Sequence, residues 1–471
     1  MKSFIKFAKT SGIYFFGTVL AKLVTMLLLR VYTEYIPTAD MGTYNVSINY
    51  VTFLCSVLYL DIWSGILRYF YDYQTPEGKR RPINCGFAIF GISTLLYTVV
   101  IAIFGMFVEV RYLPLIYLYG FMMNLQNLLG YVARAYGKNI LYASAGLLNS
   151  FITAILNILL IVGMQMDYSA LYIAGCLGYL SNILLVGAGV KIWTLIRPSA
   201  FEKELFLRMF RFSLPLCVNS AAYWFLTSYN SVAVSRMLGM EANGLYAVAI
   251  RFGSFVSLFT SCFTMAWQEI SYEKEAQSRD SRSRFYTSAV NAYLRFMGMG
   301  AAVLLPFIRL IFPLMIAEGY AASRDMVPFY ILATIASSVS GFLGNIFTAM
   351  KKNGMLFYTT AAGSAVNILG VHFLIPRFGV QGASIALLLG FMTIIVCRII
   401  LLWNEVSIRI DGRFLLFLAV ILGISCTVYF YGSFTMNAVF FPLAILLFLF
   451  SFREMIQNMI RKIRRPSGEE V

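Results

Sequence analysis

The sequence predicts an all-α polytopic membrane protein with about fourteen transmembrane helices. Of its 471 residues, 60% are hydrophobic and only 12% are charged, and the mean hydropathy is +0.76. Apolar runs long enough to cross a bilayer also recur along the whole chain, and basic residues gather in alternate links between them. Because a water-soluble core could not bury this much apolar surface, lipid must be the solvent of the protein.

Spans of about 20 apolar residues follow one another from the first residues to the last. We expect helices near residues 12–31, 44–66, 83–107, 113–133, 141–163, 169–190, 212–236, 244–268, 287–312, 326–350, 355–375, 380–402, 414–432 and 438–452. The links between them are short, and none leaves room for a separate soluble domain. Any function must therefore be built from the spans themselves.

The net charge of +16 is a topology signal rather than a sign of nucleic-acid binding. If the amino terminus is cytoplasmic, the links on that side hold 27 Lys and Arg residues, and the opposite links hold four. This asymmetry is the positive-inside rule, and the basic side also favours anionic lipid headgroups. The sequence thus predicts a multi-pass protein of the cytoplasmic membrane with both termini in the cytoplasm.

Two halves of the chain repeat each other. The run ADMGTYNVSI at 39–48 matches EANGLYAVAI at 241–250, and GKN at 137–139 with LNIL at 156–159 matches KKN at 351–353 with VNIL at 366–369. Six spans per repeat is an even number, so we expect two six-helix lobes related by a pseudo-twofold axis along the membrane normal. The predicted domains are residues 1–205, residues 206–408, and a segment 409–471 with two additional helices and a basic tail.

Several motifs resemble a known family. They are FSLPL at 212–216, WFLTSYN at 224–230, LG at 238–239, GLYAVA at 244–249 and IPRFGVQGASIA at 375–386. Together with the span count and the repeat, they resemble the Wzx-type polysaccharide and oligosaccharide flippases of the multidrug/oligosaccharidyl-lipid/polysaccharide (MOP) exporter superfamily. Where that family commonly has Asp-Arg in the seventh span, this chain has Asn230 and Ser231, so the coupling ion, H⁺ or Na⁺, stays open.

Polar residues line one face of several spans at helical spacing, which predicts a cavity wall, although such side chains also join helices to one another. The candidate substrate contacts from the second span are Asn45, Asn49 and Thr52; those from the seventh are Tyr223, Thr227 and Asn230; and those from the eighth are Ser254 and Ser261.

Three cations lie at membrane depth, where a charged side chain is expensive and commonly functional. They are Lys22 in the first span, Arg251 in the eighth and Arg295 in the ninth. Arg suits bidentate phosphate contacts and Lys a point-charge contact. We expect the three to hold a pyrophosphate head group in a central cleft, with stabilising contacts inside a lobe as the alternative.

The expected function is export of a polyprenyl-pyrophosphate-linked oligosaccharide from the inner to the outer leaflet, for cell-surface polysaccharide synthesis. A cation-coupled multidrug antiporter, a lipid II-type flippase and a non-transporting scaffold for glycan assembly enzymes are the alternatives. The expected partners are the lipid-linked substrate, membrane lipids, and a polysaccharide polymerase and glycosyltransferases, without nucleic acid. The seven cysteines have no paired spacing, so neither disulfides, a metal site nor a cofactor is expected, and no nucleophile-base arrangement suggests an enzyme.

Overall fold

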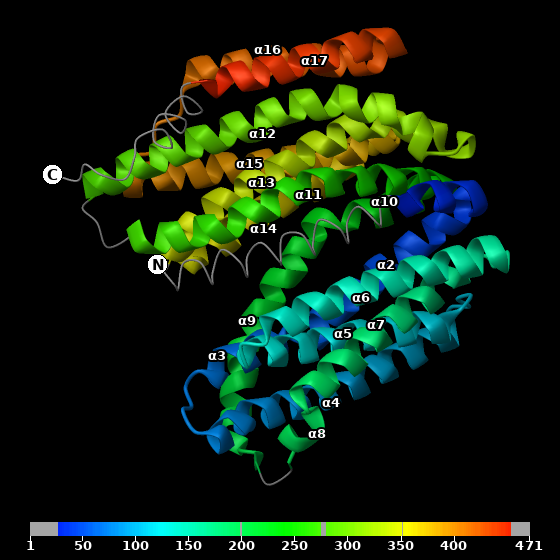
Figure 1. Cartoon of the computed structure of the whole chain (residues 1–471), viewed down its shortest axis with the longest axis vertical. Helices are drawn as coiled ribbons and strands as arrows, with labels where there is room; N and C mark the ends of the chain where they lie inside the picture. The colour runs from blue at the N-terminus through cyan, green and yellow to red at the C-terminus, as the bar shows by residue number, and fades with distance from the viewer. Residues whose placement is uncertain (1–26, 198–199, 275–278, 351, 454–471) are drawn as a thin grey trace, which may run out of the picture. The chain divides into compact units, whose positions relative to one another are not determined.

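The computed structural model describes residues 27–197, 200–274, 279–350 and 352–453, and every regular element in these ranges is helical. A helical segment at 27–35 comes first. It is followed by α2 (Thr38–Leu58), α3 (Ile62–Phe70), α4 (Pro76–Phe107), α5 (Leu113–Ala135), α6 (Asn139–Asn157), the π-helix η1 (Ile158–Gly163), α7 (Ser169–Val190), α8 (Ile192–Leu195), α9 (Lys203–Thr227) and α10 (Tyr229–Leu238). The remaining elements are α11 (Met240–Lys274), α12 (Arg279–Met315), the 3₁₀ helix η3 (Glu318–Met326), α13 (Val327–Ala349), α14 (Asn353–Phe378), α15 (Val380–Val406), α16 (Gly412–Tyr431) and α17 (Phe434–Ser451) (Figure 1).

The prediction of an all-helical polytopic membrane protein is confirmed. Among the described residues, nine helices are long and apolar enough to cross a membrane, or ten if α2 and α3 form one bent span. Helices α5, α9 and α11, with 23, 25 and 35 residues, also have spanning length by their rise of about 1.5 Å per residue. The count of fourteen stays a prediction, and its first span lies mostly outside the described residues.

Two predicted spans are broken rather than continuous. Helices α2 and α3 meet at an angle of 43°, where Leu60 and Asp61 both adopt left-handed backbone conformations. Helix α9 ends at Thr227, and α10 starts at Tyr229. The length of the apolar runs placed both spans, but it carried no signal for the breaks within them.

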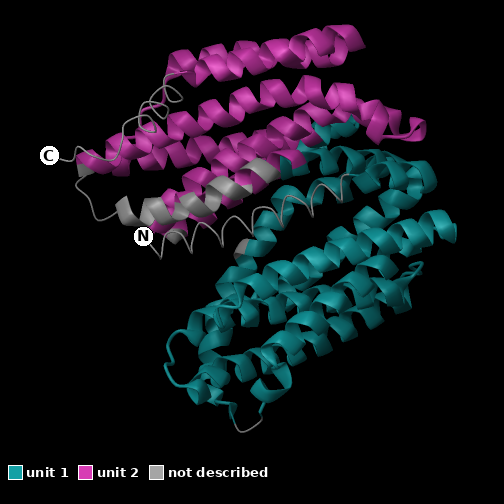
Figure 2. Cartoon of the chain, in the orientation of Figure 1, with its two compact units in different colours: residues 1–254, 367–383 teal, residues 255–366, 384–471 magenta. Residues whose placement is uncertain are grey.

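The chain forms two compact units that interleave along the sequence. Unit 1 comprises residues 1–254 and 367–383, and unit 2 comprises residues 255–366 and 384–471 (Figure 2). Unit 1 thus contains the end of α14 as well as α9, α10 and the start of α11. The predicted lobe boundaries after residues 205 and 408 do not coincide with these units and stay a prediction.

Within unit 1, α7 packs against α5 and α6, while α9 packs against α2, α3 and α4. Tyr59, Tyr97 and Phe252 are among its largest fully buried side chains. Within unit 2, the long helix α12 packs against α13, α16 and α17. The two C-terminal helices are therefore an integral part of unit 2.

An aromatic stack forms part of the core of unit 2. The ring of Phe342 lies between those of Trp267 and Tyr293, with both pairs of ring centroids 4.1 Å apart. The Trp267 indole nitrogen donates to the Phe342 carbonyl at 3.1 Å. Since a buried indole needs such a partner, the stack fixes α11 against α13.

Candidate functional site

The polar face of α2 lies against α9 and α10. Asn45 Nδ2 donates to Ser231 Oγ of α10 at 3.0 Å, and the Trp224 indole of α9 donates to the Asn49 carbonyl at 2.9 Å. Thr52 donates to its own helix, to the Asn49 carbonyl at 2.9 Å. The Asn49 and Thr52 side chains are half-buried. This stripe therefore joins helices along part of its length and leaves two polar side chains partly accessible.

Asn230 occupies a fully buried amide pair. Its Nδ2 donates to Asn367 Oδ1 at 3.2 Å and to the Ala383 carbonyl at 2.7 Å, and Asn367 Nδ2 donates back to Asn230 Oδ1 at 2.7 Å. Asn367 also donates to the carbonyls of Phe225 and Leu226. Both side chains are 0% exposed, so Asn230 ties α10 to α14 instead of reaching a solvent-filled cavity.

Two other candidates lie close to Asn230 along the chain but are more accessible. Tyr223 is 50% exposed. Thr227 donates to the Tyr223 carbonyl at 3.0 Å within α9. Both side chains remain available for contacts outside the protein core.

Arg251 borders a polar cavity of about 190 Å³ within unit 1. The cavity is lined by Leu28, Tyr32, Tyr44, Tyr119, Asn149, Ser150, Thr153, Asn157, Leu171, Gly175, Tyr179 and Arg251. The guanidinium lies 5.4 Å from the centre of the Tyr32 ring. None of the lining residues is acidic, so this cavity carries hydroxyls, amides and a positive charge.

A hydrogen-bond network orients the polar groups of this cavity. Asn157 Nδ2 donates to the Tyr32 hydroxyl at 2.9 Å, and the Tyr179 hydroxyl donates to that of Tyr119 at 3.2 Å. Asn157 Oδ1 is buried without a protein partner among the described residues. The π-helix η1 starts directly after Asn157, and such turns often occur at functional sites.

Sequence reasoning missed most of this cavity. Asn149, Thr153 and Asn157 lie four residues apart on one face of α6, a spacing that could have revealed a further polar stripe. The four tyrosines carried no such signal, because in a membrane protein tyrosine is equally common at interfaces and in helix packing.

Arg295 lies on α12 against the two C-terminal helices. Its guanidinium is 4.6 Å from the centre of the Phe414 ring of α16, and Nη1 donates to the Ser451 carbonyl of α17 at 3.3 Å. Within unit 2 these contacts give Arg295 a packing role.

The other predicted contacts are less informative. Lys22 lies outside the described residues, as does the side chain of Ser261. Ser254 is half-buried on α11. No group of three His, Cys, Asp or Glu side chains that could hold a metal ion occurs in the part of the chain that the structure describes.

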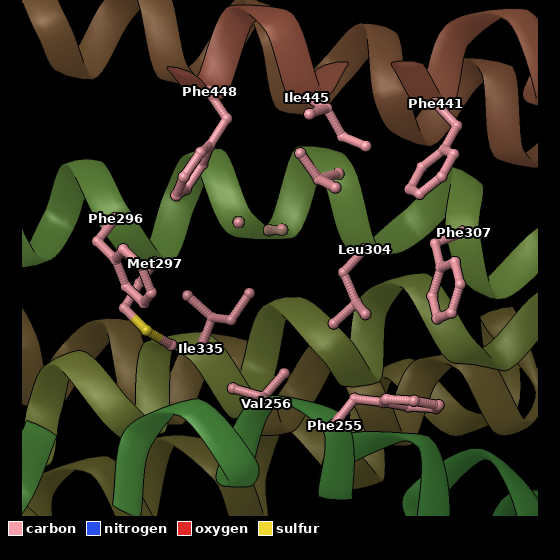
Figure 3. Close-up of a pocket in the computed structure, with 13 residues that line it drawn as sticks. Phe255, Val256, Phe296, Met297, Leu304, Phe307, Ile335, Phe441, Ile445 and Phe448 are labelled. Carbon is pink, nitrogen blue, oxygen red and sulfur yellow. The ribbon is translucent and has the colours of Figure 1, made fainter. Parts of the chain in front are cut away.

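Unit 2 contains an apolar cavity of about 500 Å³. It is lined by Phe255, Val256, Phe296, Met297, Gly300, Ala301, Val303, Leu304, Phe307, Ile335, Phe441, Ile445 and Phe448. Figure 3 shows the side chains of Phe441, Ile445 and Phe448, which α17 contributes, facing those of α11, α12 and α13. All of these side chains are hydrocarbon or thioether, so the cavity suits an aliphatic ligand.

Comparison with solved structures shows a shared fold. The structure "Lipid II flippase MurJ, inward closed conformation" superposes with a TM-score of 0.73 at 13% sequence identity, covering 95% of this chain and 100% of that one. An inward-facing MATE-family multidrug resistance transporter of the MOP superfamily gives 0.61 at 13% identity, covering 85% and 95%. An outward-facing MATE transporter gives 0.56 at 16% identity, covering 85% and 95%.

Sequence comparison is consistent with this fold. No curated protein gives a significant match to the chain. The family profile described as "Polysaccharide biosynthesis protein" matches residues 7–268, more than half of the chain. The match supports the predicted transporter and excludes the enzyme class. The chain therefore belongs to the polysaccharide biosynthesis protein family, with the membrane-transporter fold of the MOP superfamily.

Proposed function

We propose that the protein is a flippase that moves a polyprenyl-pyrophosphate-linked oligosaccharide from the inner to the outer leaflet of the cytoplasmic membrane by alternating access. The chemical contrast between the two cavities described above carries this proposal. The cavity beside Arg251 offers hydroxyls, amides and a cation, whereas the cavity in unit 2 is entirely apolar. Taken separately, the first cavity suits a polar anionic head and the second suits a hydrocarbon chain, and a polyprenyl-pyrophosphate-linked oligosaccharide has both.

Arg251 is the proposed contact for the phosphate. A guanidinium presents a planar set of N–H donors that forms paired hydrogen bonds to phosphate oxygens. The hydroxyls and amides around it suit the sugar, because a hexose presents both donors and acceptors. The partly accessible Asn49, Thr52, Tyr223, Thr227 and Ser254 side chains would add contacts to the oligosaccharide.

The site fits a multidrug antiporter less well than it fits a flippase. Cationic drugs and coupling cations call for buried carboxylates, and none of the described residues that line the polar cavity of unit 1 is acidic. At the seventh span, the amide of Asn230 is engaged with Asn367. A lipid II-type substrate would share the polyprenyl-pyrophosphate but differ in its sugars, so the glycan that accumulates when export stops identifies the substrate.

Substitution of Arg251 tests the proposal. A charge-assisted hydrogen bond contributes about 1.5–3 kcal/mol, so Arg251→Ala should lower export roughly 10–100-fold. Arg251→Lys should lower it less, and Arg251→Glu should abolish it. The measurement is surface glycan per molecule of protein in the membrane, with accumulation of the lipid-linked precursor as the second readout.

Arg236→Ala is the matched control, since Arg236 is an exposed arginine of the same unit that donates to the Tyr50 hydroxyl at 3.1 Å. We expect near-normal export from it. Lys22→Ala should also lower export, and Arg295→Ala should lower export and membrane abundance together. Normal export by all Arg251 variants would support a scaffold and would refute the flippase site.

A further inference from the structure

Two glycines at equivalent positions of the internal repeat meet face to face in unit 1. Gly42 lies in the first turns of α2, and Gly244 lies in the first turns of α11. They occupy the same column of the repeat that aligns residues 39–48 with 241–250. The two helices therefore meet through the same surface of each repeat.

The contact is backbone to backbone and reciprocal. A Cβ on Gly42 would lie 1.8 Å from the Met240 carbonyl oxygen and 3.0 Å from the Gly244 nitrogen. A Cβ on Gly244 would lie 1.9 Å from the Thr38 carbonyl oxygen and 3.2 Å from the Gly42 nitrogen. Thr38 and Met240 are themselves equivalent in the repeat, so the contact follows the symmetry of the two halves.

A hydrogen bond reinforces this contact on one side. Asn243 Nδ2 donates to the Gly42 carbonyl at 2.9 Å, and Asn243 is 0% exposed. We call the contact formed by Thr38, Gly42, Met240, Asn243 and Gly244 the glycine seam. Small residues let helix backbones approach this closely in membranes, where weak Cα–H···O contacts also contribute.

We propose that the glycine seam is the closure that seals the outer end of the transport path, opening and re-forming in each cycle. The inference rests on the alternating access proposed above. The seam joins the starts of α2 and α11, which the charge bias places at the outer membrane surface. Because both halves contribute the same surface, the seam can form only when the two repeats come together at this end.

The geometry predicts the effect of replacing either glycine by a larger residue. A carbon atom approaches a carbonyl oxygen no closer than about 3.3 Å. A methyl group at Gly42 or Gly244 thus forces the helix starts apart by about 1.5 Å, since neither partner atom belongs to a movable side chain. The open state becomes favoured, and the carrier returns inward more rarely.

The test measures opening directly, without transport. A single cysteine replaces Ser231, which is 1% exposed and pairs with Asn45 of α2, in a background without the seven native cysteines. Gly42→Ala and Gly244→Ala should each raise its labelling by an impermeant maleimide added outside by about tenfold or more. By symmetry, the two increases should agree within about threefold.

Matched variants separate a specific opening from general loosening. Gly146→Ala adds a methyl group in α6 of the same unit, where a Cβ meets nothing within 4 Å, and should leave labelling unchanged. Asn243→Asp adds no bulk but places a carboxylate oxygen against the Gly42 carbonyl oxygen. It should raise labelling of the cysteine at residue 231 by less than the two alanine variants do. A second reporter at Ala174, 0% exposed in α7, should stay unlabelled in every variant.

Two results would overturn the seam: unchanged labelling at residue 231 in both alanine variants, or equal increases at residues 231 and 174. The Arg251 variants test the flippase separately. Increased labelling in a protein whose Arg251 variants export normally would retain the seam as a contact that opens, and would reject Arg251 as the phosphate contact of the proposed flippase.

Discussion

Replacing Asn367 by alanine breaks the buried amide pair that joins α14 to α10. The pair exchanges two direct hydrogen bonds, at 3.2 and 2.7 Å. Side-chain hydrogen bonds between membrane helices contribute on average about 0.6 kcal/mol each, up to about 1.7. We therefore expect a coupling free energy of about 1–3 kcal/mol between the two side chains.

The single substitution should destabilise more than this coupling. Asn367→Ala also removes the donor to the Phe225 and Leu226 carbonyls and leaves Asn230 Oδ1 without its partner. An orphaned buried polar group costs about 1–3 kcal/mol. The total loss in the free energy of unfolding should be about 2–4 kcal/mol, with Asn230→Ala in the same range.

A double-mutant cycle measures the coupling. Unfolding of the purified protein is followed in mixed micelles by titration with a denaturing detergent for the two single variants and the double variant. Thr393→Ala is the control, because the exposed Thr393 hydroxyl donates within its own helix, to the Leu389 carbonyl, and the substitution should change stability little. A coupling below about 0.5 kcal/mol, the usual error of additivity, would refute the amide pair as a structural tie.

Three further predictions concern topology, pH and the apolar cavity. Single cysteines at Ala39 and Glu241 should react with an impermeant thiol reagent from outside and one at Asp280 should not; the reverse pattern would invert the proposed orientation. Partial burial acts to raise the pKa of Asp167, but hydrogen bonds from Ser169 and Tyr112 and the charge of Arg111 outweigh it and lower this pKa. The stabilisation from the ionised Asp167 is complete above the unfolded pKa of about 3.9 and disappears as pH falls through the folded pKa. Asp167→Asn should therefore reduce the loss of thermal stability at acid pH. An unchanged dependence of the melting temperature on acid pH would contradict this prediction. Gly300→Trp should fill the apolar cavity and lower export with little loss of membrane abundance, whereas normal export would remove this cavity from the lipid path.

The sequence alone determined the class of protein, the approximate position of the spans and the internal repeat. These properties depend on composition and local periodicity, which any long apolar segment expresses regardless of its neighbours. The repeat also located the glycine pair, since Gly42 and Gly244 share one column of the alignment. That they touch could not be read from the sequence, because a repeat shows equivalence and not contact.

Only the tertiary structure decided which surface each polar face meets. Helical spacing put Asn45 and Asn230 on polar faces, and membrane depth singled out Arg295. In the structure Asn45 bonds a neighbouring helix, Asn230 closes an amide pair, and Arg295 packs against Phe414. The cavity beside Arg251 draws its residues from five helices and the segment at 27–35, so no single stretch of sequence contains it. A period of 3.6 residues fixes the side of a helix on which a residue lies, whereas what lies opposite depends on the packing of distant segments.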